Sequence, residues 1–162
     1  MTILARAHAC AIALIAGAAI LATAAFAQQG GTAEEAKAML VKAVAAVKAD
    51  KNKALDMFNK GEGGFLDRDL YVFCSNNSDA KIVAIGNPNA KQVLGTDSRD
   101  LKDANGKAYG MEIFTAEQKG PEGQITEITG YLFARPTDPK PVPKNSFVTR
   151  VGDLGCGVGY YK

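Results

Sequence analysis

The spacing of the β-rich segments after Gly64 restricts the fold more than any other feature of this sequence. Runs of β-branched and aromatic residues, bounded by turn residues, predict strands at 70–75, 81–86, 124–134, 145–151 and 154–161. The connections between the last three runs leave too little chain for helical crossovers, which predicts antiparallel pairing. A short helix is expected at about 109–116, inside the turn-rich segment 87–123.

A long helical region precedes the strands. Thr32 and Glu35 have the spacing of a capping box, in which each side chain accepts a hydrogen bond from the other residue's backbone amide, so a helix is expected to begin there. Apolar residues then recur at helical intervals to about residue 59, with a break or kink near residues 50–52. The predicted fold class is α+β, with a long N-terminal helix packed on an antiparallel sheet of about five strands.

Residues 1–27 have the pattern of a secretory signal peptide. Arg6 precedes an apolar, alanine-rich run, and Ala25-Phe26-Ala27 is a typical cleavage site. The run is short for a bilayer span, so we expect cleavage after Ala27 rather than a retained membrane anchor. Residues 28–162 are then expected to form a single domain that is periplasmic or secreted.

Composition narrows the possible functions. The chain has one histidine, His8, which cleavage removes together with Arg6. Removing Arg6 lowers the 19 basic residues to 18 against 17 acidic ones, and a net charge of +1 gives no electrostatic footprint for nucleic acid. Two cysteines remain, Cys74 and Cys156, and an even pair in an oxidising compartment is a candidate disulfide.

Two segments look like ligand loops, but each lacks an essential part. The glycine-rich run 155–159 would need a following helix to bind phosphate, whereas only three residues follow it. Residues 101–112 match part of an EF-hand calcium loop, yet Leu101 stands where the first carboxylate should be. We therefore expect a terminal strand and a surface turn, without a metal ion or a cofactor.

Catalysis is not expected either. Without histidine the mature chain has no serine triad, no Cys–His pair and no histidine-bearing zinc or haem site. The carboxylate pair Asp67 and Asp69 has no general acid–base signature by itself, and nothing else in the sequence supports a catalytic pairing of Ser146 with Lys144.

Ligand binding is the better supported hypothesis. The strand at 124–134 carries apolar bulk on both faces, with Tyr131 and Phe133 on one and Ile128 and Leu132 on the other. One face is expected to receive the helix, and the other to line a pocket.

Two more residues are candidates for this pocket. Tyr109 is expected near its wall, and Lys144 could supply the single positive charge that orients an anionic ligand. Ordinary core aromatics and a lysine that extends to the surface are the alternative interpretation.

Seven short blocks follow one another in a distinctive order and spacing, at residues 70–74, 85–88, 93–97, 101–107, 131–136, 143–148 and 156–161. Together they resemble a single Cache domain, over nearly all of residues 33–162. The resemblance implies an extracytoplasmic, PAS-like sensor domain that binds a small organic molecule, often a short carboxylate. Tyr131, Phe133 and Lys144 match positions that contribute to the family's pocket. Asn87 stands before Pro88, where many members have histidine, and is a further candidate.

The resemblance also bears on partners and on the cysteines. Most members lie between two membrane spans of chemoreceptors or sensor kinases, so this chain is expected to be a free-standing member that presents its ligand to a membrane receptor or kinase. A PAS-like order places the first and last strands side by side, which predicts a structural disulfide between Cys74 and Cys156. Two alternatives stay open: a structural or protein-interaction module without a ligand and, with less support, a thiol redox protein.

Overall fold

The computed structural model describes residues 30–162, so the predicted signal peptide and its cleavage site lie outside the described residues. Two helices come first, α1 (Ala33–Ala49) and α2 (Lys51–Lys60). The predicted capping box is present, because Thr32 Oγ1 accepts from the Glu35 amide at 3.2 Å and the Glu35 carboxylate accepts from the Thr32 amide at 2.8 Å. Asp50 interrupts the helical region, ending α1 and capping α2 through the amide of Lys53. No helix within residues 30–162 is long and apolar enough to span a bilayer.

The sheet is antiparallel throughout and has six strands. They are β1 (Leu66–Asp67), β2 (Leu70–Asn76), β3 (Ile82–Ile85), β4 (Thr126–Ala134), β5 (Pro141–Val151) and β6 (Leu154–Tyr161). The order runs from β2 through β6 and β5 to β4, while β1 and β3 both pair with β2. The α+β prediction is confirmed, and the two-residue strand β1 is an addition to the five expected strands.

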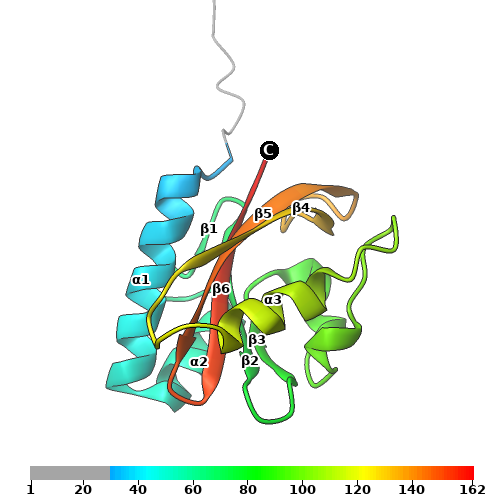
Figure 1. Ribbon diagram of the computed structural model, residues 1–162. Helices are drawn as coiled ribbons and strands as arrows, with labels where there is room; N and C mark the ends of the chain where they lie inside the picture. Colours follow the sequence, from blue (N-terminus) through cyan, green and yellow to red (C-terminus); the bar gives the residue numbers. More distant parts are fainter. Residues whose placement is uncertain (1–29) are drawn as a thin grey trace, which may run out of the picture.

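The segment between β3 and β4 covers one face of the sheet. It contains the 3₁₀ helices η1 (Pro88–Val93) and η2 (Ser98–Asp100) and the helix α3 (Tyr109–Gln118). Figure 1 shows α1 and α3 on opposite sides of the sheet, so each face has its own helical cover.

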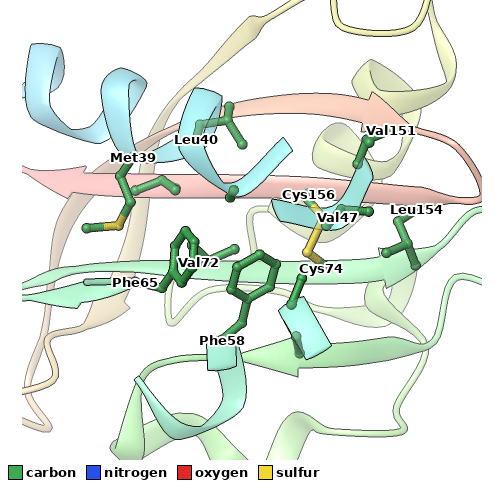
Figure 2. Packing of buried hydrophobic residues seen from close by; sticks show 14 of the residues in the cluster. Met39, Leu40, Val47, Phe58, Phe65, Val72, Cys74, Val151, Leu154 and Cys156 are labelled. Carbon is green, nitrogen blue, oxygen red and sulfur yellow. A yellow bond between two sulfur atoms is a disulfide. The ribbon is translucent and has the colours of Figure 1, made fainter. Parts of the chain in front are cut away.

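The larger core lies between the sheet and the helices α1 and α2 (Figure 2). Leu40 and Phe58 from these helices pack against Val72, Cys156 and Val158 from the strands, and all five are buried. Alternate residues of a strand point to opposite faces. The remaining positions of β6, where glycines alternate with these core residues, therefore face α3.

The prediction of the sheet face on which Ile128 lies is wrong. Ile128 was expected on the face opposite Tyr131, but both side chains belong to the cluster beneath α3, together with Tyr109 and Val148. The pairing of β4 with β5 shifts register between Ile128 and Tyr131, and Gly130 there has a φ of +70°. An irregularity of this kind breaks the two-residue alternation, so Ile128 faces the same side as Tyr131.

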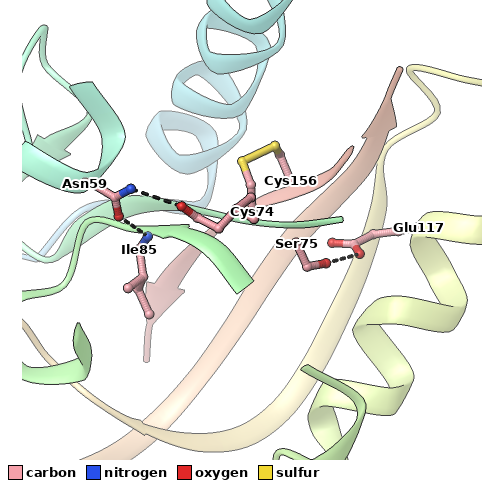
Figure 3. Close-up of a disulfide and its surroundings, with 7 residues drawn as sticks. Asn59, Cys74, Ser75, Ile85, Glu117 and Cys156 are labelled. Atoms are coloured by element: carbon pink, nitrogen blue, oxygen red, sulfur yellow. Dashed lines mark hydrogen bonds between the residues drawn. A yellow bond between two sulfur atoms is a disulfide. The ribbon is translucent and has the colours of Figure 1, made fainter. Parts of the chain in front are cut away.

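The predicted disulfide between Cys74 and Cys156 is present, with an S–S distance of 2.08 Å. The two residues are direct partners across β2 and β6, which lie side by side (Figure 3). Both are buried in the core beneath α1 and α2. The bond therefore ties the first long strand of the sheet to the last.

Replacing both cysteines, as Cys74→Ala with Cys156→Ala, should lower the free energy of unfolding by about 4 to 5 kcal/mol. The disulfide spans 82 residues of sequence, and on the chain-entropy relation a loop of that length restricts the unfolded state by this amount. Urea denaturation followed by far-ultraviolet circular dichroism measures the difference. A loss below about 1 kcal/mol would contradict the entropic account.

Candidate ligand-binding site

A cavity of about 50 Å³ lies between the sheet and α3. Several parts of the fold supply its walls: the strands β2, β3, β4 and β5, the helix α3, and the segment that contains η1 and η2. Its lining is mostly apolar and includes Tyr71, Phe73, Ser75, Ser98, Tyr109, Ile113, Glu117, Tyr131, Phe133 and Lys144.

Four of the five predicted ligand-binding residues meet in this cavity: Tyr109, Tyr131, Phe133 and Lys144. The rings of Tyr109 and Tyr131 are stacked with their centroids 4.6 Å apart, and Phe133 meets Tyr109 edge-on at 6.0 Å. Such pairs hold aromatic side chains in fixed orientations. The aromatic wall is therefore a rigid surface that contacts both the sheet and α3.

Asn87 is not among the residues that line the cavity. It is fully buried, its Nδ2 donates to the carbonyl of Ala134 at 2.9 Å, and its Oδ1 accepts from the amide of Asn89 at 2.9 Å. These bonds attach the beginning of η1 to the end of β4.

Lys144 is the most unusual residue of the cavity, because its side chain is buried with 2% exposure. The alternative of a lysine that extends to the surface is therefore wrong. Its Nζ donates to the hydroxyl of Tyr71 at 2.6 Å and lies 4.0 Å from the centre of that ring. The rings of Phe133 and Tyr161 lie 4.9 and 5.1 Å from the same nitrogen, which gives it partial stabilisation by cation–π contacts.

The amine of Lys144 has no carboxylate within 4.0 Å among the described residues. Burial lowers the pKa of Lys144 well below its usual range, and the charge of Asp69 opposes this effect. Asp69 itself accepts from the amide of Gly31 at 2.6 Å and lies 3.8 Å from Arg135 Nε. An ammonium group has three hydrogen-bond donors, and only one of those on Lys144 has a partner in the described structure.

Glycines on β6 make space for the polar side chains. A Cβ at Gly159 would lie 2.0 Å from Lys144 Cε, and a Cβ at Gly155 would lie 2.1 Å from Glu117 Oε2. Between them, a Cβ at Gly157 would lie 2.3 Å from the ring of Phe73. The run that looked like a phosphate loop therefore lies directly beneath three side chains that line the cavity, and its glycines mark close approach to the strand, as glycines within strands commonly do.

Sequence reasoning missed Glu117, which lies near the end of α3 with 1% exposure and also lines the cavity. Ser75 Oγ donates to its Oε2 at 3.5 Å, and its Oε1 has no hydrogen-bond partner among the described residues (Figure 3). Burial raises the pKa of Glu117 to about 8, and the bond from Ser75 opposes the shift. The sequence could have indicated Glu117, because Tyr109, Ile113 and Glu117 follow one another at four-residue intervals and so share a helix face.

No protein-family model matches the sequence, and a search of curated proteins finds no match. Solved structures match in fold. A methyl-accepting chemotaxis protein from Vibrio parahaemolyticus aligns with a TM-score of 0.62 and 24% identity, over 79% of this chain and 86% of that chain. A periplasmic sensor domain of a chemotaxis protein gives 0.58 and 22%, over 79% and 88% of the two chains.

A third solved structure is a Cache chemosensory domain described in terms of carboxylic acid recognition, with a TM-score of 0.55 and 20% identity over 79% of this chain and 86% of that chain. Together with the strand order, this match decides the fold class. The chain has the fold of a single Cache-like sensor domain. In this Cache-like domain the cavity lies between the sheet and the helical segment that precedes β4.

Replacing Glu117 with glutamine should stabilise the domain at alkaline pH. The folded pKa of about 8 exceeds the ordinary value of 4.5, so the folded state binds more protons than the unfolded state between these pH values and wild-type stability falls as pH rises through that window. Glutamine does not ionise. The Glu117→Gln variant should match wild type near pH 4.5 and exceed it by a few kcal/mol at pH 8.5, since one pKa unit corresponds to about 1.4 kcal/mol. Urea denaturation across this range measures the gap, and a gap independent of pH would contradict the raised pKa.

Lys144→Met should make the free domain at least as stable as wild type at pH 7, because the variant buries no amine. The pKa of Lys144 is lowered in the folded state, so the unfolded state binds more protons below its ordinary value of 10.5, and wild-type stability rises with pH there. The advantage of Lys144→Met should therefore shrink between pH 7 and pH 9.5 in urea denaturation. The exposed Lys140 supplies the control, as Lys140→Met should show no such change. A Lys144→Met advantage that grows with pH would refute the assignment.

Proposed function

We propose that this Cache-like domain is a non-catalytic, extracytoplasmic sensor that binds a small carboxylate, with Lys144 holding the carboxylate group. One observation carries the proposal: a buried amine faces a cavity and has no anionic partner among the described residues. Buried charges in proteins are paired, because an unpaired charge in an apolar environment is costly. An anionic ligand would supply the missing partner.

The chemistry of the cavity suits a carboxylate. Its two oxygens can accept the two unused N–H donors of Lys144, while Tyr71 keeps its bond to the third. The arriving negative charge favours the ammonium form, which raises the pKa of Lys144 on binding. The aromatic wall of Tyr109 and Phe133 then packs against the carbon chain of the ligand.

The size of the cavity favours a small ligand. A single water needs about 10–15 Å³, whereas pockets for drug-sized ligands measure about 300–1,000 Å³. The cavity of about 50 Å³ lies between these limits. It is therefore suited to a slender molecule of a few carbon atoms.

The setting of this domain supports a sensory role. The predicted signal peptide and the disulfide suit an oxidising compartment outside the cytoplasm. The matching solved structures come from chemotaxis proteins, and one of them is named as periplasmic. We propose that the protein presents its ligand to a membrane receptor or a sensor kinase.

A thermal-shift screen of acetate, propanoate, butanoate and lactate tests the binding step. A ligand at 100 times its dissociation constant should add about 2.7 kcal/mol of stability, which appears as an increase in Tm. Lys144→Met should abolish the increase, whereas the exposed-site control Lys140→Met should retain it.

Two outcomes would contradict this proposal. Absence of any Tm increase across a broad set of carboxylates would favour the structural or interaction module. An increase that survives in Lys144→Met would place the carboxylate elsewhere, because that variant keeps the volume of the side chain and removes only the amine.

A further inference from the structure

The cavity has a second polar end, which carboxylate binding at Lys144 does not use. Glu117 reaches into it from α3, and Glu117 Oε1 is buried without a hydrogen-bond partner among the described residues. Ser98 Oγ lines the same cavity and is likewise buried and unpartnered there. Among the described residues, the only hydrogen bond of the Ser75 hydroxyl is the 3.5 Å contact with Glu117. Buried polar atoms in proteins nearly always have partners, so the unpartnered oxygen of Glu117 is a candidate to accept a hydrogen bond from a ligand.

The two polar ends lie over opposite ends of the glycine run 155–159 of β6. The tip of Lys144 lies over Gly159 and the carboxyl group of Glu117 lies over Gly155, each within 3 Å of where a Cβ would be. Four residues of a strand span roughly 13 Å at about 3.3 Å per residue. The ring of Phe73 lies over Gly157 between them, and Ile113 adds apolar lining. The cavity is thus polar at both ends and apolar in the middle.

Within residues 30–162, no lysine or arginine forms an ion pair with Glu117. The strand register places the basic residue Arg150 opposite Gly155, over which the Glu117 carboxyl group lies. Its guanidinium is directed instead to the carbonyl of Gly120 at 3.4 Å, and it forms no ion pair with Glu117 within the described part of the chain. The polar groups known to meet at this end are therefore the carboxyl group of Glu117 and the hydroxyl group of Ser75.

We propose that the preferred ligand is an unbranched ω-amino carboxylate, whose carboxylate binds Lys144 and whose terminal ammonium binds Glu117 and Ser75. This inference rests on the proposed function and names the class of ligand for the same cavity. An ammonium offers three donors and no acceptor, which suits the two carboxylate oxygens of Glu117 and the hydroxyl oxygen of Ser75. A second carboxylate would instead enter a buried site without a cation, which is unfavourable. Lys144 and Glu117 then each have a partner of opposite sign.

The length of the ligand follows from the same geometry. The span of roughly 13 Å from Gly155 to Gly159 approximates the separation of the Glu117 carboxyl group and the Lys144 amine. Subtracting two hydrogen bonds of about 2.8 Å leaves roughly 7 Å between the two head groups of the ligand. An extended chain of five or six carbons has that length. The narrow cavity also favours an unbranched chain over a ring or a branched skeleton.

Isothermal titration calorimetry on the mature protein tests the inference with matched pairs of ligands. These are pentanoate with 5-aminopentanoate and hexanoate with 6-aminohexanoate, with acetate as a probe of Lys144 alone and glutarate as a probe for a second carboxylate. The better amino carboxylate should bind at least about tenfold more tightly than its unsubstituted partner, a ratio equivalent to about 1.4 kcal/mol.

Glu117→Gln should reduce this preference to about twofold or less and leave the affinity for acetate within about twofold of wild type. Glutamine has the same shape and should preserve the fold, which the melting curve checks. Glu112→Gln, at an exposed position on the same helix, should keep the full preference.

The outcomes separate this inference from the function on which it rests. Equal affinity for both members of each pair, with acetate still bound through Lys144, would overturn the amine assignment and leave the carboxylate sensor intact. Tighter binding of glutarate than of the amino carboxylates would also overturn it. Binding of none of these probes would refute both proposals.

Discussion

The two faces of β6 control both the stability of this domain and its cavity. β6 pairs with β2 on one side and with β5 on the other, and its residues alternate between the two faces of the sheet. On the face toward α1, Cys156 and Val158 complete the core and the disulfide. On the face toward α3, the intervening positions are glycines, which leave space above the strand. Any larger side chain there would collide with the residues that give the cavity its polar ends.

That space contains two ionisable groups whose burial opposes folding. Burial lowers the pKa of Lys144 and raises the pKa of Glu117, so each charged form is disfavoured in the free domain. The well-packed core on the opposite face, with its disulfide between Cys74 and Cys156, offsets this cost. Placing the main core and the cavity on opposite faces allows the cavity to keep unfavourable groups without loss of the fold, as functional sites commonly do.

The same arrangement explains why the phosphate-loop interpretation fails and why the glycine pattern still matters. Glycines in a phosphate loop expose backbone amides to an anion. The glycines of β6 keep their backbone in the sheet and instead admit side chains from β2, β5 and α3. One of the side chains that they make room for is Lys144, for which we propose anion binding.

Local signals in the sequence determined the elements of the fold. The capping box at Thr32, the strand runs and the short connections required a helical region followed by an antiparallel sheet, because capping and alternation act over a few residues. The irregularity at Gly130 was not readable, since one residue out of register depends on how β5 pairs with β4.

The candidate site, like the fold, was predictable from the sequence only in part. The sequence by itself singled out Lys144 and the aromatic residues as a group, because a lone lysine among apolar residues is unusual wherever it lies. Only the tertiary structure decided that Lys144 is buried without a carboxylate partner and that Glu117 faces the same cavity, although 27 residues separate the two in the chain. Burial and pairing depend on which elements pack together across the sheet, and that packing involves residues distant in sequence.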